Sequence, residues 1–219
     1  MADFTIREYK NRDYDAVRRM FGEGMMEHLP ATGTHLLKLF QVQLFFFISF
    51  LGVLFVSQSY LLSLVTLAIL FLAGRWQLNK EFQEYVEQCK REDLLDIEKS
   101  YVANDNSCFW VAESNDRVVG MVGAQSALLS NEVMTLRRMS VARDQRGKGI
   151  AKALCRKVID FARQRGYKTV SLETSMVQYA AQRLYENMGF RKTSVQILPT
   201  LFGKFAKFSV LTYEFKIHD

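Results

Sequence analysis

The segment RDQRGKGIAKAL, residues 143–154, contains two glycines and four cationic side chains, and its second half favours a helix. Glycine lets the backbone approach a ligand closely, because no side chain stands in the way. The first N–H groups of a helix lack partners within it and lie at the positive end of its dipole, so they attract anions. Arg146 and Lys148 add charge that can pair with phosphate. The segment predicts a site for a phosphate-bearing ligand, the alternative being a basic turn without one.

Two common phosphate-binding loops do not fit this segment. The P-loop requires Ser or Thr directly after its Gly-Lys pair, whereas Gly149 follows Lys148 here. The dinucleotide-binding fingerprint Gly-x-Gly-x-x-Gly would begin at Gly147, but its last position is Lys152. Neither motif is therefore present.

Two short segments resemble the GCN5-related N-acetyltransferases. Residues 146–151, RGKGIA, are similar to the Gln/Arg-x-x-Gly-x-Gly/Ala loop that holds the pyrophosphate of acetyl-CoA in this family. Residues 181–190, AQRLYENMGF, are similar to its Ala-x-x-Leu-Tyr-x-x-x-Gly-Phe segment, and each segment follows a predicted strand. The resemblance covers nearly the whole chain outside residues 36–75. It implies an α/β (α+β) fold, with a mixed central sheet flanked by helices, and an acetyl-CoA-dependent acyltransferase.

The resemblance also implies which residues contact acetyl-CoA. The main chain of Met139 and Val141 would position the pantetheine arm and the thioester. Gln178 stands where the family often has Asn, so an amide is kept on a longer arm. The pyrophosphate would be bound by the six loop residues Arg146, Gly147, Lys148, Gly149, Ile150 and Ala151.

Acetyl transfer to an amine also needs groups that move protons. The departing CoA thiolate benefits from a proton donor, which in this family is the Tyr of the Leu-Tyr pair and here matches Tyr185. The attacking amine must be neutral, and Glu173, late in a predicted strand, can accept its proton directly or through water. The alternatives are a core tyrosine at position 185 and a surface carboxylate at position 173.

The elements that must position these residues are readable from hydrophobic periodicity. Alternating or continuous apolar stretches predict strands, and apolar residues at helical spacing predict helices. The predicted strands are 4–9, 108–112, 118–123, 134–141, 169–174 and 211–217. The predicted helices are 13–26, 77–103, 149–165 and 177–188.

One long segment departs from the pattern of a water-soluble domain. From Leu39 to Gly74 the chain has no charged residue. A run of more than about 18 apolar residues is typical of a membrane-embedded segment, the alternatives being a buried core hairpin or an oligomer interface. At 1.5 Å per residue one helix over this run would be about 54 Å long, against a hydrocarbon core of about 30 Å. The polar triplet 57–59, Ser-Gln-Ser, therefore predicts a bend and a helical hairpin.

The hairpin fits a three-part organisation of the chain. The strand and helix before it belong to the same fold as the residues after it, so both ends of the hairpin must reach one compartment. Cations flank it on both sides, which favours the cytosolic face. The predicted parts are residues 1–35, the first strand and helix; residues 36–75, the membrane-embedded insertion; and residues 76–219, the remainder of the acetyltransferase domain with the acetyl-CoA site.

The combination resembles the camello-type, membrane-bound N-acetyltransferases of vertebrates. Similar stretches include residues 24–32, 107–114 and 149–154. The resemblance implies an enzyme of the endoplasmic reticulum membrane, with its catalytic domain facing the cytosol. Its acceptor would be the α-amine of a cysteine S-conjugate or a related amino acid, or else a lysine side chain of a protein. A membrane-anchored module that keeps the fold without catalysis is the rival class.

The amino-acid composition limits which partners and metal sites can be expected. The net charge of +6 and the pI near 9.2 favour anionic partners such as a nucleotide cofactor. The basic residues are spread along the chain rather than gathered in one stripe, so no nucleic-acid partner is expected. The three cysteines are scattered, without a Cys-x-x-Cys motif, and no metal site is expected.

Overall fold

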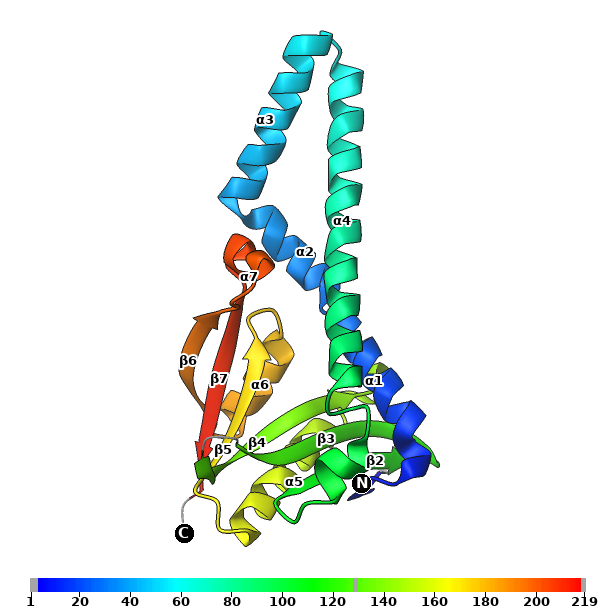
Figure 1. Cartoon of the computed structure of the whole chain (residues 1–219), viewed down its shortest axis with the longest axis vertical. Coiled ribbons are helices and arrows are strands. Elements are labelled where there is room, and N and C mark those ends of the chain that lie inside the picture. Colours follow the sequence, from blue (N-terminus) through cyan, green and yellow to red (C-terminus); the bar gives the residue numbers. More distant parts are fainter. Residues whose placement is uncertain (1–3, 128–129, 218–219) are drawn as a thin grey trace. The chain divides into compact units, whose positions relative to one another are not determined.

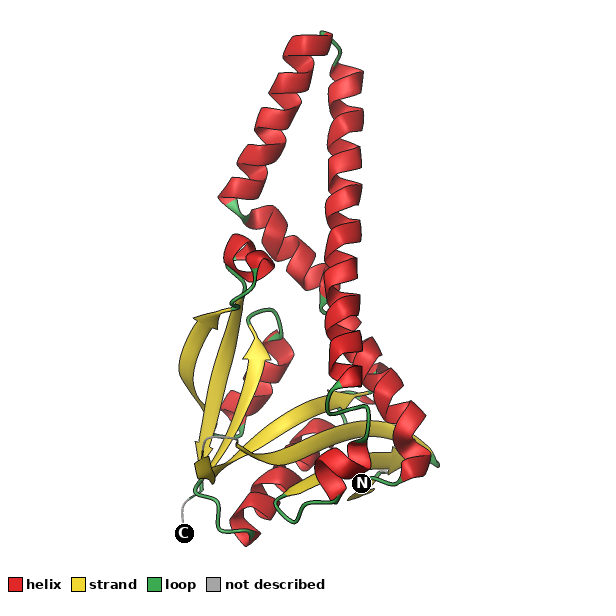
Figure 2. Cartoon of the chain, viewed as in Figure 1, coloured by secondary structure: helices red, strands yellow, loops and turns green. Residues whose placement is uncertain are grey.

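The computed structural model describes residues 4–127 and 130–217. The chain divides into two compact units, one formed by Met1–Gly24 with Gln88–Asp219 and the other by Met25–Glu87. The first unit holds the sheet and the second is helical (Figures 1 and 2).

Seven strands of the described residues form one mixed sheet in the order β1-β2-β3-β4-β5-β7-β6. The pairing of β4 with β5 is parallel, and the other pairings are antiparallel. The β2–β3 turn has Asn115 and Asp116 at positive φ, as a type I′ hairpin turn requires. The strands are β1 Thr5–Glu8, β2 Ser107–Ser114, β3 Arg117–Ala127, β4 Ser130–Val141, β5 Thr169–Ser175, β6 Arg191–Ile197 and β7 Ser209–Lys216.

Helical segments cover both faces of the sheet. On one face, Leu154 and Val158 of α5 and Tyr185 of α6 join the main hydrophobic core. On the other face, Tyr101 of η2 packs edge-on against Phe109, with ring centroids 5.1 Å apart. The segments of this unit are η1 Asn11–Asp13, α1 Tyr14–Met26, η2 Glu98–Val102, η3 Arg143–Gln145, α5 Ile150–Gln164, α6 Tyr179–Asn187 and α7 Leu201–Ala206.

The two central strands diverge before they end. The parallel register of β4 with β5 runs from Val133↔Thr169 to Leu136↔Leu172 and stops there. Beyond that point β4 stays paired with β3, and β5 stays paired with β7. Figure 1 shows the two strands leaving a common corner of the sheet in different directions. The last residues of β4 therefore present an open edge where β5 has turned away.

A β-bulge interrupts β4 beside this open edge. Met121 is opposite Ser140 and Gly123 is opposite Arg137, so two residues of β4 face one residue of β3. Arg138, within the bulge, has φ +57°, a left-handed conformation that non-glycine residues adopt rarely. Such strained positions cluster at functional sites.

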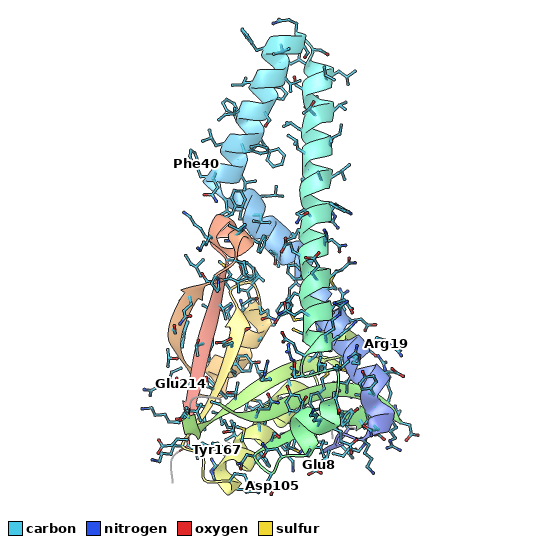
Figure 3. The ribbon with its side chains drawn as sticks, in the orientation of Figure 1. Glu8, Arg19, Phe40, Asp105, Tyr167 and Glu214 are labelled. Atoms are coloured by element: carbon cyan, nitrogen blue, oxygen red, sulfur yellow. The ribbon has the colours of Figure 1, made fainter. Side chains whose placement is uncertain are left out.

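The second unit contains two long apolar helices. Helix α2 spans Leu29–Lys38, α3 spans Phe40–Ser57 and α4 spans Tyr60–Arg91. The chain reverses between α3 and α4 at Gln58, which has φ +51°. Both α3 and α4 are long and apolar enough to cross a membrane by length and composition. Their side chains project outward around the helices, Phe40 among them, and the apolar ones are largely exposed (Figure 3).

Most of the predicted elements are confirmed, with small shifts at their ends, and the bend at residues 57–59 is confirmed as well. The helix predicted over 77–103 is wrong in its second half, because α4 ends at Arg91 and η2 is a separate short segment. Within that range, Tyr85 and Leu95 are 47% and 58% exposed. Helices α2 and α7, strand β6 and the short segments η1 and η3 were not predicted.

Candidate active site

The predicted anion-binding loop lies between β4 and α5. Gly147 and Gly149 have φ +80° and +83°, a region that favours glycine, and α5 begins at Ile150. Ile150 and Leu154 pack so closely on β3 that a Cβ atom added at Gly120 would lie 2.9 and 3.0 Å from their side chains. The small residue at position 120 thus fixes the start of α5 beside the end of β4.

The amides of this loop are available to a ligand. The first helical bond of α5 runs from Ala153 N–H to Gly149 C=O, at 3.0 Å. Within the described parts of the chain, the N–H groups of residues 147–152 have no acceptor. A Cβ atom added at Gly147 or Gly149 would meet nothing within 4 Å. Open space beside unpaired amides at a helix N-terminus suits the pyrophosphate of acetyl-CoA.

The cationic side chains of the loop also brace it. Arg146 Nε donates a hydrogen bond of 3.1 Å to the carbonyl oxygen of Val141, which ties the loop to the last residue of β4. Lys148 Nζ lies 2.7 Å from the side-chain oxygen of Gln145. Both residues are exposed, so their charge also faces solvent above the amides.

The open edge of β4 carries a backbone donor. Ala142 N–H donates to Val119 C=O at 2.9 Å, and peptide directions alternate along an antiparallel ladder. The N–H of Val141 therefore points away from β3, toward the edge that β5 has left. Met139 follows Arg138 in the bulge, and its side chain packs against the main core. The two strand residues predicted to contact the thioester thus lie at the divergence of β4 and β5.

Gln178 lies at the junction of β5 and α6. Its side-chain oxygen accepts hydrogen bonds of 2.9 Å from the hydroxyl of Thr174 and from the backbone N–H of Ser175. The oxygen is therefore occupied in holding this turn. The amide NH₂ group remains as the part of Gln178 that can donate to a ligand.

Tyr185 lies in the core beneath the divergence. It is 5% exposed, and its ring packs against Phe190 and Tyr213 with centroids 5.7 and 6.2 Å away. Burial, together with the nearby Cys155, raises the pKa of its hydroxyl, which is therefore protonated at neutral pH. Among the described residues Tyr9 alone has a fully enclosed side-chain polar atom without a partner. The hydroxyl of Tyr185 has no hydrogen-bond partner among the described residues either.

Glu173 lies on the opposite face of the sheet from Tyr185. In β5 the side chains of Val170, Leu172 and Thr174 are buried, whereas Glu173 is exposed. Its carboxylate has no hydrogen bond or ion pair with the described residues. The predicted acid and base thus flank the divergence of β4 and β5 from two sides.

Two arginines of β4 were not among the predicted site residues. Arg138 is buried, and its guanidinium binds the carboxylate of Asp93 at 2.5 Å, contacts Cys89 Sγ at 3.0 Å and lies over the ring of Phe21. Arg137 points to the same face as Gly123, the residue opposite it, and donates to Gln125. Arg137 and Arg138 are adjacent in the sequence, which shows that both are cationic. The bulge gives them different environments, because Arg138 forms an ion pair with Asp93 and Arg137 does not.

Comparison with known proteins places these features in a family. Residues 74–190 match the family described as "Acetyltransferase (GNAT) family". The chain belongs to that family. It is 45% identical over 217 residues to "Probable N-acetyltransferase camello" of Xenopus tropicalis, covering 99% of each chain. It is therefore an acetyl-CoA-dependent N-acetyltransferase, related to the camello-type enzymes.

Solved structures support the fold. The acetyltransferase of the GNAT family from Staphylococcus aureus Mu50 superposes with a TM-score of 0.62 at 18% identity, covering 98% of this chain and 99% of that one. An acetyltransferase from Salmonella typhimurium, solved with its cofactor acetyl-CoA, gives a TM-score of 0.56 at 15% identity, covering 99% and 95%. The GNAT family uses acetyl-CoA, and the loop described above fits the phosphates of that ligand.

Proposed function

We propose that this GNAT enzyme is anchored in the endoplasmic reticulum membrane and acetylates the α-amine of a cysteine S-conjugate or a related amino acid. The observation that carries the proposal is the arrangement around the diverging strands. Unpaired amides lie at the start of α5, a backbone donor lies at the edge of β4, and candidate proton-transfer groups lie on both faces. The apolar hairpin and the resemblance to camello-type enzymes support the membrane location.

The chain's own residues would hold acetyl-CoA by its two ends. The N–H groups of residues 147–152 would bind the pyrophosphate, with charge from Arg146 and Lys148. The NH₂ of Gln178 and the edge of β4 would bind the pantetheine arm. Bound in this way, acetyl-CoA supplies an acetyl group that is activated as a thioester.

Acetyl transfer at the edge of β4 requires that negative charge on the acetyl oxygen is stabilised and that two protons are transferred. The amine nitrogen forms a bond to the acetyl carbon, and the bond from that carbon to sulfur breaks. The N–H of Val141 would stabilise negative charge on the acetyl oxygen, as oxyanion donors do. Glu173 would accept the proton that the amine loses, directly or through water, and Tyr185 would donate a proton to the departing sulfur. Because Tyr185 stays protonated at neutral pH, its hydroxyl is always available as that donor.

Both ends of the apolar hairpin would lie on the cytosolic side, where the catalytic unit would reach cytosolic acetyl-CoA. Helix α3 and the first half of α4, up to Trp76, expose apolar side chains that a bilayer would cover. Because β1 and β2 pair in one sheet although the hairpin separates them in sequence, the chain must return to the side from which it entered.

Product analysis tests the proposal. Microsomes that contain the chain would be incubated with labelled acetyl-CoA and a panel of amines: cysteine S-conjugates, other amino acids and lysine-containing peptides. We expect acetylation of the α-amine of amino acids, identified by mass spectrometry. If labelled acetyl groups are found only on lysine side chains, or on none of these amines, the proposed acceptor is wrong.

A further inference from the structure

Arg137 and Glu173 occupy matching positions on the two diverging strands. The parallel register pairs Thr135 with Ser171 and Leu136 with Leu172, so the next positions are Arg137 and Glu173. Side chains at matching positions of neighbouring parallel strands point to the same face. The strands separate at this point, and no ion pair joins the two residues. An arginine and a glutamate thus stand on opposite sides of the proposed transfer site.

Arg137 is held in place without a carboxylate partner. Its Nη1 donates a hydrogen bond of 3.0 Å to the side-chain oxygen of Gln125, and Gln125 Nε2 donates one of 2.8 Å to the backbone oxygen of Ser100. Among the described residues, no carboxylate lies within ion-pair distance of Arg137. The remaining N–H groups of its guanidinium are therefore available, in the planar fork that suits a carboxylate.

The carboxylate of Asp93 is bound by Arg138, the neighbour of Arg137 in β4. Asp93 is engaged by Arg138 in a two-point contact of 2.5 and 3.0 Å, and the hydroxyl of Tyr101 donates to the same carboxylate. Its side chain is 10% exposed, so this cluster is closed to solvent. One arginine of the pair is thus satisfied within the protein, and the other is left to a ligand.

We propose that Arg137 binds the α-carboxylate of an amino-acid acceptor whose amine faces Glu173 and the open edge of β4. The inference rests on the proposed function, which it deepens by naming the group that recognises the acceptor. In an α-amino acid the carboxylate and the amine are attached to one carbon, so two opposite charges on neighbouring strands can hold both. A lysine side chain carries no carboxylate beside its amine and would make no use of Arg137.

A matched pair of acceptors tests the role of Arg137 in the full-length, membrane-bound enzyme. The pair is S-benzyl-L-cysteine and its primary amide, which differ in the charge at the carboxyl carbon. For Arg137→Gln we expect kcat/KM to fall about 10- to 100-fold with the acid, the range for losing a charge-assisted hydrogen-bond pair, mainly through KM. With the amide, kcat/KM should be unchanged. Arg137→Lys should restore part of the loss, because charge is kept while the fork is lost.

Arg191→Gln is the matched control, since Arg191 is an exposed arginine on the outer strand β6 and should leave both acceptors unaffected. The inference is overturned if Arg137→Gln lowers activity equally with the acid and the amide, or leaves both unchanged. Those outcomes would still leave α-amine acetylation by the unmodified enzyme in place. Failure of the unmodified enzyme to acetylate either acceptor would instead contradict the proposed function and the inference with it.

Discussion

The guanidinium of Arg138 and the carboxylate of Asp93 form two hydrogen bonds, of 2.5 and 3.0 Å, behind the bulge of β4. Their side chains are 7% and 10% exposed. Asp93 follows helix α4 in the chain, whereas Arg138 precedes Met139 at the open edge of the sheet. The contact therefore fastens the strand that would hold the thioester to the segment that follows the hairpin.

Asp93→Asn should destabilise the catalytic unit by about 3–5 kcal/mol, because it leaves the buried guanidinium of Arg138 without its counter-charge. Chemical unfolding of the solubilised protein measures this. Asp144→Asn is the control, since Asp144 pairs with Arg117 on the exposed surface and should contribute little. An equal effect of the two substitutions would contradict the role given to the buried pair.

The effect of Asp93→Asn on the free energy of unfolding should depend on pH. Burial by itself would raise the pKa of Asp93, but hydrogen bonds from Arg138 and Tyr101 outweigh it and hold that pKa below the ordinary value. A carboxyl whose pKa is lowered in the folded state stabilises the fold above its unfolded pKa, about 3.9, and this contribution is lost as pH falls through the folded value. The difference in unfolding free energy between the two proteins should therefore shrink below about pH 4. If the difference in unfolding free energy between the unmodified protein and Asp93→Asn does not change with pH, this role of the Asp93 carboxylate is contradicted.

Tyr185→Phe should lower kcat by about 10²- to 10⁴-fold, the range for losing a general acid. Binding of acetyl-CoA should persist, because the ring and its packing against Phe190 are kept. Tyr213→Phe is the matched control, since the hydroxyl of Tyr213 on β7 donates to the carboxylate of Glu186 on α6 at 2.8 Å. If Tyr185→Phe behaves like the control in steady-state kinetics, Tyr185 has a structural role only.

Glu173→Gln should lower kcat/KM by about 10²- to 10⁴-fold with a basic amine, since the amine then loses its proton acceptor. The loss should be smaller with a weakly basic aromatic amine, which is already neutral at the assay pH. Glu214→Gln is the control, because Glu214 of β7 lies opposite Ser171 and therefore on the same face of the sheet, farther from the divergence (Figure 3 labels Glu214). Equal losses for weakly and strongly basic amines would exclude Glu173 as the base.

Tags at the two termini should be equally accessible to protease in sealed microsomes, because β1 and β2 pair in one sheet on either side of the hairpin. If the catalytic unit faces the cytosol, both tags are cut without detergent. Detergent-treated microsomes provide the control for cleavage. One protected and one cleaved tag would exclude a hairpin that returns to its starting side.

Much of the fold was predictable because local signals agreed with it. The buried residues of α5 recur at helical spacing in the sequence, and Gly147 and Gly149 indicate the loop between β4 and α5. The bend at Gln58 was predictable because two polar serines flank it within an apolar run. Tyr185 and Glu173 lie in a helix and a strand that were both predicted, α6 and β5.

Other features depend on contacts that one segment cannot reveal. Strand β6 was missed because it lies at the edge of the sheet and is exposed on most positions, so it lacks an apolar alternation. Helix α2 was missed because Pro30 and Gly33 resemble a helix break, although Pro30 lies in its first turn, where proline is tolerated. The bulge at Arg138 arises from the register with β3, and without it the different environments of Arg137 and Arg138 cannot be inferred.

Calorimetry tests most directly whether the loop before α5 binds acetyl-CoA. The quantity measured is the affinity of the solubilised protein for acetyl-CoA, compared between Gly149→Ala and Gly166→Ala. The two glycines have φ +83° and +75°, and a Cβ atom added at either meets nothing within 4 Å, so the backbone strain introduced should be similar. Only Gly149 lies beside the amides that would bind the pyrophosphate. We predict that Gly149→Ala weakens binding at least about tenfold, equivalent to about 1.4 kcal/mol, while Gly166→Ala binds like the unmodified chain. Equal affinities in two folded variants would contradict the assignment of this loop to acetyl-CoA.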